Sequence, residues 1–281
     1  MALSEDDFDY VRGLVREQAG IVLDTRKYLV ESRLASLARK EGFATSEEVV
    51  ARLRERRYGS LTRKVVESMT IHETAFFRDV HPFEVLRTTV LPKVLSRRIL
   101  TRKLAIWCAA CSTGQEPYSV AMLLREHFPS LAKWDVSLIA SDLSERVLSR
   151  AKEGRFTQLE VNRGLSPELV SRYFEPDGGD WRIRDDVRAM VDFREINLLA
   201  KWPPMPRLDV VVMRNVLIYF DADTKRSILS RLAGVLEPDG YLFLGGAETT
   251  VYLDDSFVRM PLERAGCYRF RSFAEEEARH A

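Results

Sequence analysis

Polar side chains follow apolar, strand-like runs in this sequence, where they could bind a ligand that contains a nucleoside. The run 103–110 is followed by the turn 111–117, which holds one glycine and opens a helix. Such a turn lets backbone N–H groups approach a ligand closely. Asp142 ends the run 136–142, where a carboxylate can accept two hydrogen bonds from ribose hydroxyls. The alternatives are an ordinary strand-to-helix turn and, for Asp142, a helix N-cap.

Two further polar groups stand at comparable positions. Arg214 and Asn215 directly follow the apolar run 208–213, at the end of a strand where a ligand would lie. The alternative is that both side chains only hydrogen-bond within the loop. The segment 70–79, at the junction of the two halves of the chain, holds two adjacent phenylalanines and Arg78. These phenylalanines could equally be core residues, and the arginine could form a surface ion pair.

The elements that must position these residues change character along the chain. Apolar residues at helical spacing predict helices over the first seventy residues, with breaks at Gly20, Gly42 and Gly59. From about residue 103, strands alternate with helices, which predicts an α/β fold with a parallel, doubly wound sheet. In addition to the strands above, we expect helices over 116–128, 144–153 and 222–236 and a strand over 241–244.

Residues 155–195 interrupt this alternation. A Pro-Asp-Gly-Gly-Asp turn is flanked by 181–184 and 190–193, in which apolar and polar residues alternate. This pattern predicts a small antiparallel β-subdomain inserted into the sheet domain. We therefore expect an all-helical domain over 1–75 and an α/β domain over 76–281 that contains the insertion.

Composition narrows the class of protein. The chain has 281 residues, of which 46% are hydrophobic and 30% charged, as in a folded globular protein. Its net charge of +1 gives no global electrostatic attraction to nucleic acid or membranes. The sequence has no apolar run that could span a bilayer, and an acidic stretch follows Met1. Three cysteines make no disulfide framework, so we expect a cytoplasmic protein.

Cys108 and Cys111 raise a redox alternative, because Trp-Cys-Ala-Ala-Cys has the form of a thioredoxin-like site. The same spacing could hold two ligands of a metal. The sequence has no second cysteine pair, however, and its four histidines lack ligand spacing. Burial of Cys108 as a small apolar residue is the simpler interpretation, whereas an unusually acidic Cys111 thiol would support redox function.

Five motifs together resemble the CheR-type chemotaxis protein methyltransferases. They occur in the order of that family, and the resemblance covers nearly the whole chain. The motifs are 72–78 (similar to N-x-T-x-F-F-R), 109–119 (similar to the S-adenosylmethionine loop), 140–142, 197–199 and 214–220 (similar to R-N-V-x-I-Y-F). The resemblance implies a Rossmann-like class I methyltransferase domain with an inserted β-subdomain, preceded by an all-α domain.

The resemblance also implies the residues of the site. Asp142 would bind the ribose of S-adenosylmethionine, and Arg78 and Tyr219 would be catalytic residues that flank the methyl-transfer centre. His72 stands where the family usually has Asn, and its imidazole can donate or accept one hydrogen bond. The cofactor-binding residues would be His72, Thr74, Arg78, Glu116, Asp142, Asn197, Leu198, Arg214 and Asn215.

The implied reaction moves a methyl group from the sulfonium of S-adenosylmethionine to a glutamate carboxylate of a chemoreceptor. It yields a glutamate methyl ester and S-adenosylhomocysteine and uses no metal. A solvated glutamate has a pKa of about 4.3 and is ionised at neutral pH, so no general base is required. Holding the carboxylate oxygen and the methyl carbon in line can supply about 7–11 kcal/mol. The alternatives are a cofactor sensor without catalysis and a methyltransferase for RNA or another protein.

The implied partner is the cytoplasmic helical bundle of a chemoreceptor, bound by a monomer of this chain. Residues 50–103 hold thirteen Lys or Arg and five Asp or Glu, a local excess that suits an acidic helical surface. We expect Arg52, Arg54, Arg56 and Arg57 to assist docking, with a solvated face as the alternative. The turn in the insertion is shorter than in family members that bind a receptor's C-terminal pentapeptide, which implies action without that tether.

Overall fold

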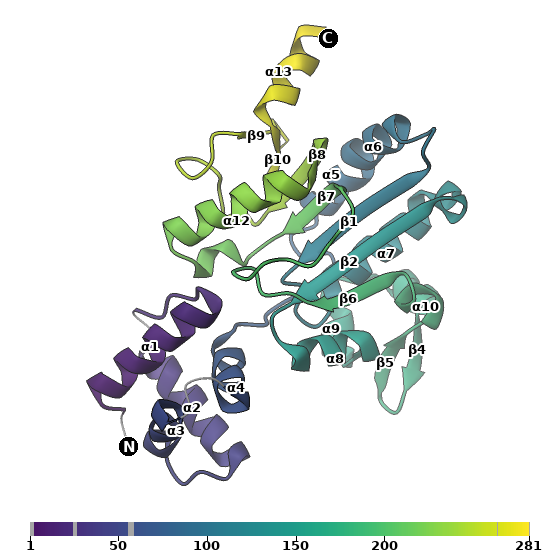
Figure 1. Ribbon diagram of the computed structural model, residues 1–281. Coiled ribbons are helices and arrows are strands. Elements are labelled where there is room, and N and C mark those ends of the chain that lie inside the picture. Colours follow the sequence, from purple (N-terminus) through teal and green to yellow (C-terminus); the bar gives the residue numbers. More distant parts are fainter. Residues whose placement is uncertain (1–2, 25–26, 56–58, 263, 281) are drawn as a thin grey trace. The chain divides into compact units, whose positions relative to one another are not determined.

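The computed structural model describes the whole chain except residues 1–2, 25–26, 56–58, 263 and 281 (Figure 1). The chain divides into two compact units, which are described separately. The first consists of Met1–Ile71 with the short segments Asn197–Lys201 and Tyr219–Thr224. The second contains His72–Ile196, Trp202–Ile218 and Lys225–Ala281. The predicted boundary lies a few residues later, between residues 75 and 76.

The first unit contains four helices in the part that the structure describes before residue 72. They are α1 (Glu5–Ala19), α2 (Lys27–Glu41), α3 (Ser46–Glu55) and α4 (Ser60–Met69). Each helix buries most of the apolar residues whose spacing predicted it, for example Phe8, Val11 and Leu14 of α1, whereas Leu29 of α2 and Leu61 of α4 are only partly buried. The N-terminus of α3 is capped by Thr45, whose hydroxyl accepts from the Glu48 N–H at 3.2 Å.

The two later segments of the first unit pack at the end of α1. The N–H of Val22 donates to the carbonyl of Tyr219 at 2.9 Å, and Ile21 forms an isolated β-bridge with Phe220. The Asn197 side chain donates to the carbonyl of Gln18 at 2.8 Å. The end of α1 therefore fixes two loops that come from far along the chain.

Gly20 permits this packing. It has φ +71°, and a Cβ at this position would lie 2.7 Å from a methyl carbon of Leu199. Gly42 has a similar φ of +79° but nothing within 4 Å of such a Cβ. We expect Gly20→Ala to lower the free energy of unfolding by about 1–2 kcal/mol more than Gly42→Ala, because only the first adds a steric clash. Urea denaturation of both variants measures the difference, and equal losses would contradict the packing role of Gly20.

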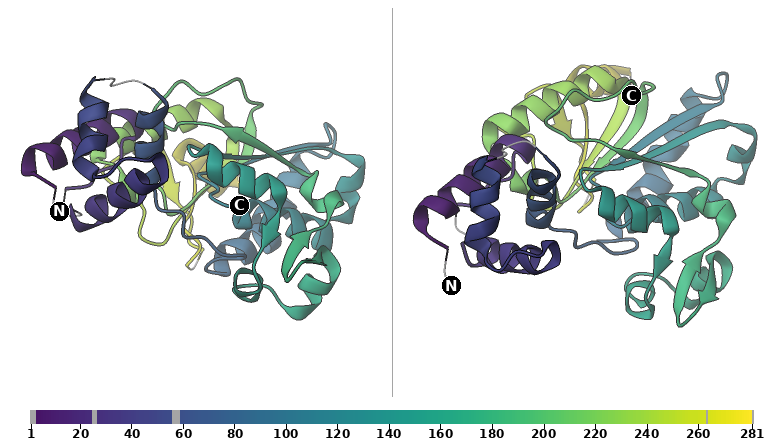
Figure 2. Two further views of the ribbon diagram at one scale, coloured as in Figure 1. Left: turned by 90° about the horizontal axis from the view of Figure 1, so that it is seen from below. Right: turned by 60° about the horizontal axis from the view of Figure 1, so that its bottom comes forward.

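The second unit is built on a seven-stranded sheet with the order β6-β2-β1-β7-β8-β10-β9 (Figure 1). Figure 2 shows the same fold from two further directions. Its strands are β1 (Lys103–Ala109), β2 (Asp135–Asp142), β6 (Val191–Glu195), β7 (Leu208–Met213), β8 (Leu236–Leu244), β9 (Phe257–Arg259) and β10 (Cys267–Phe270). Neighbouring strands from β6 to β8 pair in parallel, whereas β10 is antiparallel to both β8 and β9. The predicted α/β sheet is confirmed, with an antiparallel end that the sequence pattern did not indicate.

Helices cover the sheet. In the view of Figure 1, α12 lies in front of it and α5 to α7 lie behind it. The helical elements are α5 (His81–Val85), the π-helical turn η1 (Leu86–Val90), α6 (Leu91–Arg97), α7 (Gln115–His127), the 3₁₀ turns η2 (Pro129–Lys133) and η3 (Leu217–Tyr219), α8 (Glu145–Glu153), α12 (Ala222–Val235) and α13 (Arg271–His280). Ile106, Cys108 and Val212 of the sheet share one buried core with Leu86, Leu91 and other residues of these helices. Among the described residues, no helix combines the length and apolar character that crossing a bilayer requires.

The strand expected over 241–244 is the end of a longer one. β8 begins at Leu236 and runs through Pro238 and Gly240, near which the sequence placed the end of the helix 222–236. Its pairing with β7 shifts register between Leu208 and Val210. Such an irregularity accommodates proline and glycine inside a strand.

The insertion forms a second, three-stranded antiparallel sheet with the order β3-β5-β4. Its elements are β3 (Arg155–Phe156), α9 (Gln158–Asn162), α10 (Pro167–Tyr173), β4 (Phe174–Asp177), β5 (Asp180–Ile183) and α11 (Asp185–Arg188). The predicted turn is confirmed, because Asp177 pairs with Asp180 across two glycines. The prediction that 190–193 belongs to this sheet was wrong: residues 191–193 lie in β6, which pairs with β2 in the main sheet. An edge strand with one buried face alternates in the same way as a hairpin strand.

Candidate active site

The loop after β1 is tied to the end of β2. The N–H of Cys111 donates to the carbonyl of Ser141 at 2.8 Å, and the N–H of Ser112 donates to Oδ2 of Asp142 at 2.9 Å. Three residues of this loop have positive φ, namely Ala110, Ser112 and Gly114. The loop is therefore held in a strained shape beside the carboxyl end of β2, where open α/β sheets bind ligands.

Asp142 is buried, and both of its carboxylate oxygens are already used by the backbone. Oδ1 accepts from the N–H of Ser144 at 3.0 Å, and Oδ2 accepts from Ser112. The residue at the N-cap of α8 is Ser144, so the N-cap alternative for Asp142 is wrong. Each carboxylate oxygen keeps a second lone pair, so Asp142 can still accept hydrogen bonds from ribose hydroxyls.

Arg214 joins three segments through its guanidinium, and its side chain is only 1% exposed. Nη1 donates to Oε2 of Glu116 at 3.0 Å, and Nη2 donates to the carbonyl of Arg78 at 3.0 Å and to Oδ2 of Asp79 at 2.5 Å. These contacts connect the end of β7, the first turn of α7 and the segment before α5. Its Nε is buried without a hydrogen-bond partner among the described residues, so it could donate to an acceptor of a bound ligand.

Glu116 is the buried carboxylate of this network. Desolvation raises its pKa to about 7, although the neighbouring Arg214 lowers it. The carboxyl group is therefore partly protonated near neutral pH in the free protein. A cationic ligand placed beside it would favour the ionised form, which makes Glu116 suited to a positively charged cofactor.

The segment 72–79 is anchored by its backbone. The Ser112 hydroxyl donates to the carbonyl of His72 at 2.9 Å, and the N–H of Phe77 donates to the hydroxyl of Ser119 at 2.9 Å. Phe77, Asp79 and Val80 all have positive φ, so the backbone is strained on both sides of Arg78. Thr74 lies half-buried in this anchored stretch.

The structure shows the surroundings of Phe76 and of Arg78, for which the sequence left a core position and a surface ion pair as alternatives. Phe76 is a core residue, with its ring centroid 4.9 Å from that of Phe156 in the insertion. Arg78 is half-buried, and its Nη1 donates to the backbone carbonyl of Glu73 at 3.0 Å. Its side chain is therefore held by the strained segment.

The predicted site residues fall in both units. The second unit contains His72, Thr74, Arg78, Glu116, Asp142, Arg214 and Asn215. The first unit contains Asn197, Leu198 and Tyr219, on the two segments at the end of α1. The contacts above bring Arg78, Glu116 and Arg214 into one network and tie Asp142 to the loop after β1. The roles of all these residues stay predictions.

Sequence reasoning missed Glu248. Its buried carboxylate accepts hydrogen bonds from four backbone N–H groups, in the loops that follow β7 and β8. The available signal was an acidic residue shortly after a buried strand, which is too common to single out a site.

The cysteines do not support the redox alternative. Burial raises the pKa of both Cys108 and Cys111 well above the usual range of a thiol. A reactive cysteine requires the opposite shift. Over the part of the chain that the structure describes, no three His, Cys, Asp or Glu side chains are grouped for metal binding.

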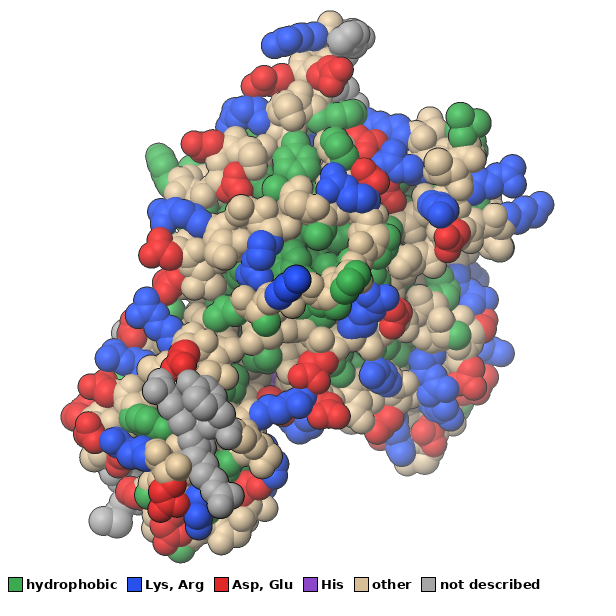
Figure 3. Space-filling model, viewed as in Figure 1, with side chains coloured by type: hydrophobic (Ala, Val, Ile, Leu, Met, Phe, Trp, Pro, Cys, Tyr) green, Lys and Arg blue, Asp and Glu red, His purple; other side chains and the backbone are tan. Residues whose placement is uncertain are grey.

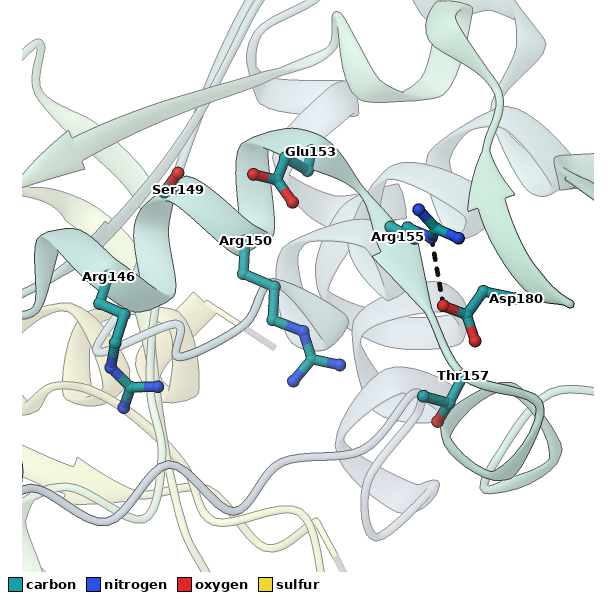
Figure 4. A pocket seen from close by; sticks show the side chains of 7 residues that line it. All are labelled: Arg146, Ser149, Arg150, Glu153, Arg155, Thr157 and Asp180. Carbon is teal, nitrogen blue, oxygen red and sulfur yellow. Dashed lines mark hydrogen bonds and ion pairs between the residues drawn. The ribbon is translucent and has the colours of Figure 1, made fainter. Parts of the chain in front are cut away.

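A separate hollow of about 470 Å³ lies between α8 and the β-subdomain (Figure 4). It is lined by Arg146, Ser149, Arg150, Glu153, Arg155, Thr157 and Asp180. Arg155 pairs with Asp180 at 3.1 Å, and Arg150 pairs with Glu160 at 2.6 Å. Carboxylates thus offset much of its positive charge, and none of the predicted cofactor residues lines it.

The sheet, parallel from β6 to β8 with an antiparallel end, has the architecture of a class I methyltransferase domain, in which ligands bind at the carboxyl ends of the parallel strands. Residues 72–265 match the family model "CheR methyltransferase, SAM binding domain", and residues 6–70 match "CheR methyltransferase, all-alpha domain". The chain belongs to the CheR methyltransferase family.

Similar chains extend over nearly its full length. Chemotaxis protein methyltransferase 1 of Pseudomonas aeruginosa is 42% identical over 274 residues, which cover 96% of this chain and 99% of the relative. Chemotaxis protein methyltransferase Cher2 of Pseudomonas putida is 40% identical, with 92% and 95% covered. The chemotaxis protein methyltransferase of Escherichia coli is 34% identical, with 92% and 89% covered.

Proposed function

We propose that this methyltransferase transfers the methyl group of S-adenosylmethionine to glutamate carboxylates of chemoreceptors. The products would be glutamate methyl esters and S-adenosylhomocysteine, formed for sensory adaptation. The proposal rests on full-length similarity to proteins named chemotaxis protein methyltransferases. The organised loops around Asp142 and Arg214 support it, because they offer polar groups suited to a cationic nucleoside cofactor.

The residues of the site suit a transfer that needs no general base. The acceptor carboxylate is ionised at neutral pH, so the enzyme has only to align its oxygen with the methyl carbon. We assign the ribose to Asp142 and the positive charge of the cofactor to the surroundings of Glu116. Arg78 would position the acceptor carboxylate or the cofactor, and Tyr219 would border the sulfonium. S-adenosylmethionine supplies the activated methyl group.

The raised pKa of Glu116 gives a pH dependence of cofactor binding. At pH values below its pKa of about 7, the carboxyl group of Glu116 is neutral. Its attraction to a cationic cofactor is therefore lost as the pH falls. We expect the Kd for S-adenosylmethionine, which carries the sulfonium charge, to rise between about pH 7.5 and about pH 6, by up to about tenfold per unit below the pKa. Calorimetric titration across this range measures the rise. The Glu116→Gln variant should bind more weakly but with a flat profile, and an unchanged slope in this variant would contradict the assignment.

The decisive test of function is transfer of labelled methyl from S-adenosylmethionine to receptor cytoplasmic fragments, followed by mild base. Carboxyl methyl esters release their label in mild base, so base-labile label on the receptor supports both the reaction and the substrate class. Absence of label, in a protein that still binds S-adenosylhomocysteine, would overturn the substrate and leave the cofactor. Receptor fragments with glutamine at the candidate sites provide the control.

Docking to the acidic receptor bundle is proposed for the basic residues near α3. Arg54 is engaged by Asp6 and Asp7, and Arg52 pairs with Glu55 at 3.0 Å. Arg56 and Arg57 lie outside the described residues. Acidic and basic side chains are interspersed on the visible face of the first unit (Figure 3). Docking would therefore depend on individual ion pairs between this unit and the receptor. The charge-reversed variant R52E should raise KM for receptor at low salt in the same assay.

The β-subdomain is proposed to act without a receptor tether. Its hairpin turn contains only Gly178 and Gly179 between the paired residues Asp177 and Asp180. Methylation rates of receptor fragments with and without their C-terminal pentapeptide test this directly, and equal rates are expected.

A further inference from the structure

Glu248 occupies the junction of two loops at the carboxyl end of the sheet in the second unit. Oε2 accepts from the N–H of Asn215 at 2.8 Å and from that of Gly245 at 2.5 Å. Oε1 accepts from the N–H of Val216 at 2.9 Å and from that of Ile218 at 3.3 Å. One side chain, only 8% exposed, thus satisfies four backbone donors of the loops that follow β7 and β8.

The loop after β7 needs such an anchor. Asn215 has φ +60°, a left-handed conformation that costs a non-glycine residue free energy. Its neighbour Arg214 is fixed by ion pairs with Glu116 and Asp79. Between these constraints, a carboxylate that accepts from residues 215, 216 and 218 defines the path of the backbone.

The conformation of the loop after β8 places the Glu248 carboxylate beside the loop after β7. The N–H of Glu248 donates to the carbonyl of Gly245 at 2.9 Å, which folds the chain back. A Cβ at Gly245 would lie 2.7 Å from Oε2 of Glu248 and 2.9 Å from the backbone nitrogen of Asn215. Only glycine allows the two loops to approach this closely.

We propose that Glu248 is a positioning residue for the cofactor site, acting through the backbone of residues 215–218. It holds Asn215 in its left-handed conformation and thereby fixes the polar pair Arg214 and Asn215 for S-adenosylmethionine. The proposal rests on the proposed cofactor role of that pair. Its chemistry depends on the negative charge, since a carboxylate offers only acceptors to four converging donors.

Glu248→Gln tests this dependence, because the amide nitrogen cannot accept and confronts at least one N–H group with another donor. We expect its Kd for S-adenosylhomocysteine, titrated calorimetrically on folded protein, to rise by about tenfold or more. Amide hydrogen exchange of residues 215, 216 and 218 should accelerate in the same variant. Glu248→Asp, which keeps the charge on a shorter side chain, should recover part of the affinity.

Asp209→Asn is the matched control. Asp209 is a buried carboxylate near the amino end of β7, where it accepts from the N–H of Ala105 at 2.9 Å and from Nε of Arg98 at 2.8 Å. This variant should lose stability while its folded fraction keeps the wild-type Kd.

The outcomes separate the two proposals. Wild-type Kd in Glu248→Gln, with a loss of Tm like that of Asp209→Asn, would make Glu248 merely structural and overturn the inference. Absence of S-adenosylhomocysteine binding by the wild-type protein would instead overturn the cofactor assignment on which the inference rests.

Discussion

Replacing Arg78 with alanine is expected to lower kcat for methyl transfer by about a hundredfold while the protein stays folded. The strained backbone at Phe77, Asp79 and Val80 holds this side chain in place, and strain of this kind is typical of functional sites. The half-buried guanidinium makes its described hydrogen bond to a backbone carbonyl, so its loss leaves no buried charge behind. Initial rates with labelled S-adenosylmethionine, together with Tm, measure both effects.

Arg87→Ala is the control for this prediction. Arg87 lies beyond the strained segment, in η1, and pairs with Glu84 at 2.6 Å, which is not one of the predicted site residues. Its removal should leave kcat unchanged. Near-normal turnover in Arg78→Ala would refute a role for Arg78 in the reaction.

The second large effect is expected for Arg214→Met. The substitution preserves much of the buried volume but removes the charge that pairs with Glu116 and Asp79. Glu116 then remains buried without its cation, so its pKa should rise further above about 7. We expect the free energy of unfolding at neutral pH to fall by about 3 kcal/mol, and cofactor binding to be lost. Urea denaturation and calorimetric titration measure the two changes.

A matched ion pair at the other end of β7 separates stability from function. Arg98 pairs with Asp209 at 2.8 Å and with Asp239 at 2.5 Å, and all three side chains are largely buried. Arg98→Met should lower stability as well, but its folded fraction should keep the wild-type Kd for S-adenosylhomocysteine. If Arg214→Met also retained this Kd, the arginine would serve the fold alone.

The main architecture was predictable because its signals are local. Apolar runs of strand length alternate with helical spacing, and this pattern correctly indicated β1, β2 and β7 and the helices after them. The short strands β9 and β10 were not predicted, since runs of three or four residues carry little periodic signal. Strand β6 was assigned to the wrong sheet because its alternating burial gives no information about its partner.

The candidate site was predictable only where a motif marked it. Asp142 ends a buried strand and Arg214 directly follows another, so their position at the ligand edge follows from the topology of the sheet. The network that joins Arg214 to Glu116 and Asp79 depends on three segments meeting in space, which no local pattern encodes. Glu248 was not predicted for the same reason, because the four N–H groups that donate to it come from two different loops.

The first unit is built from three separate segments of the chain, which affects how it folds during synthesis. Helices α1 to α4 leave the ribosome long before residues 197–201 and 219–224, which complete the packing at the end of α1. Until those segments emerge, the surface that receives Leu199 and Phe220 beside Gly20 stays uncovered. Folding of this unit therefore depends on contacts of high sequence separation, despite its helical content, and finishes late in translation. A chain that stops before residue 197 would lack the contacts of Leu199 and Phe220 at the end of α1.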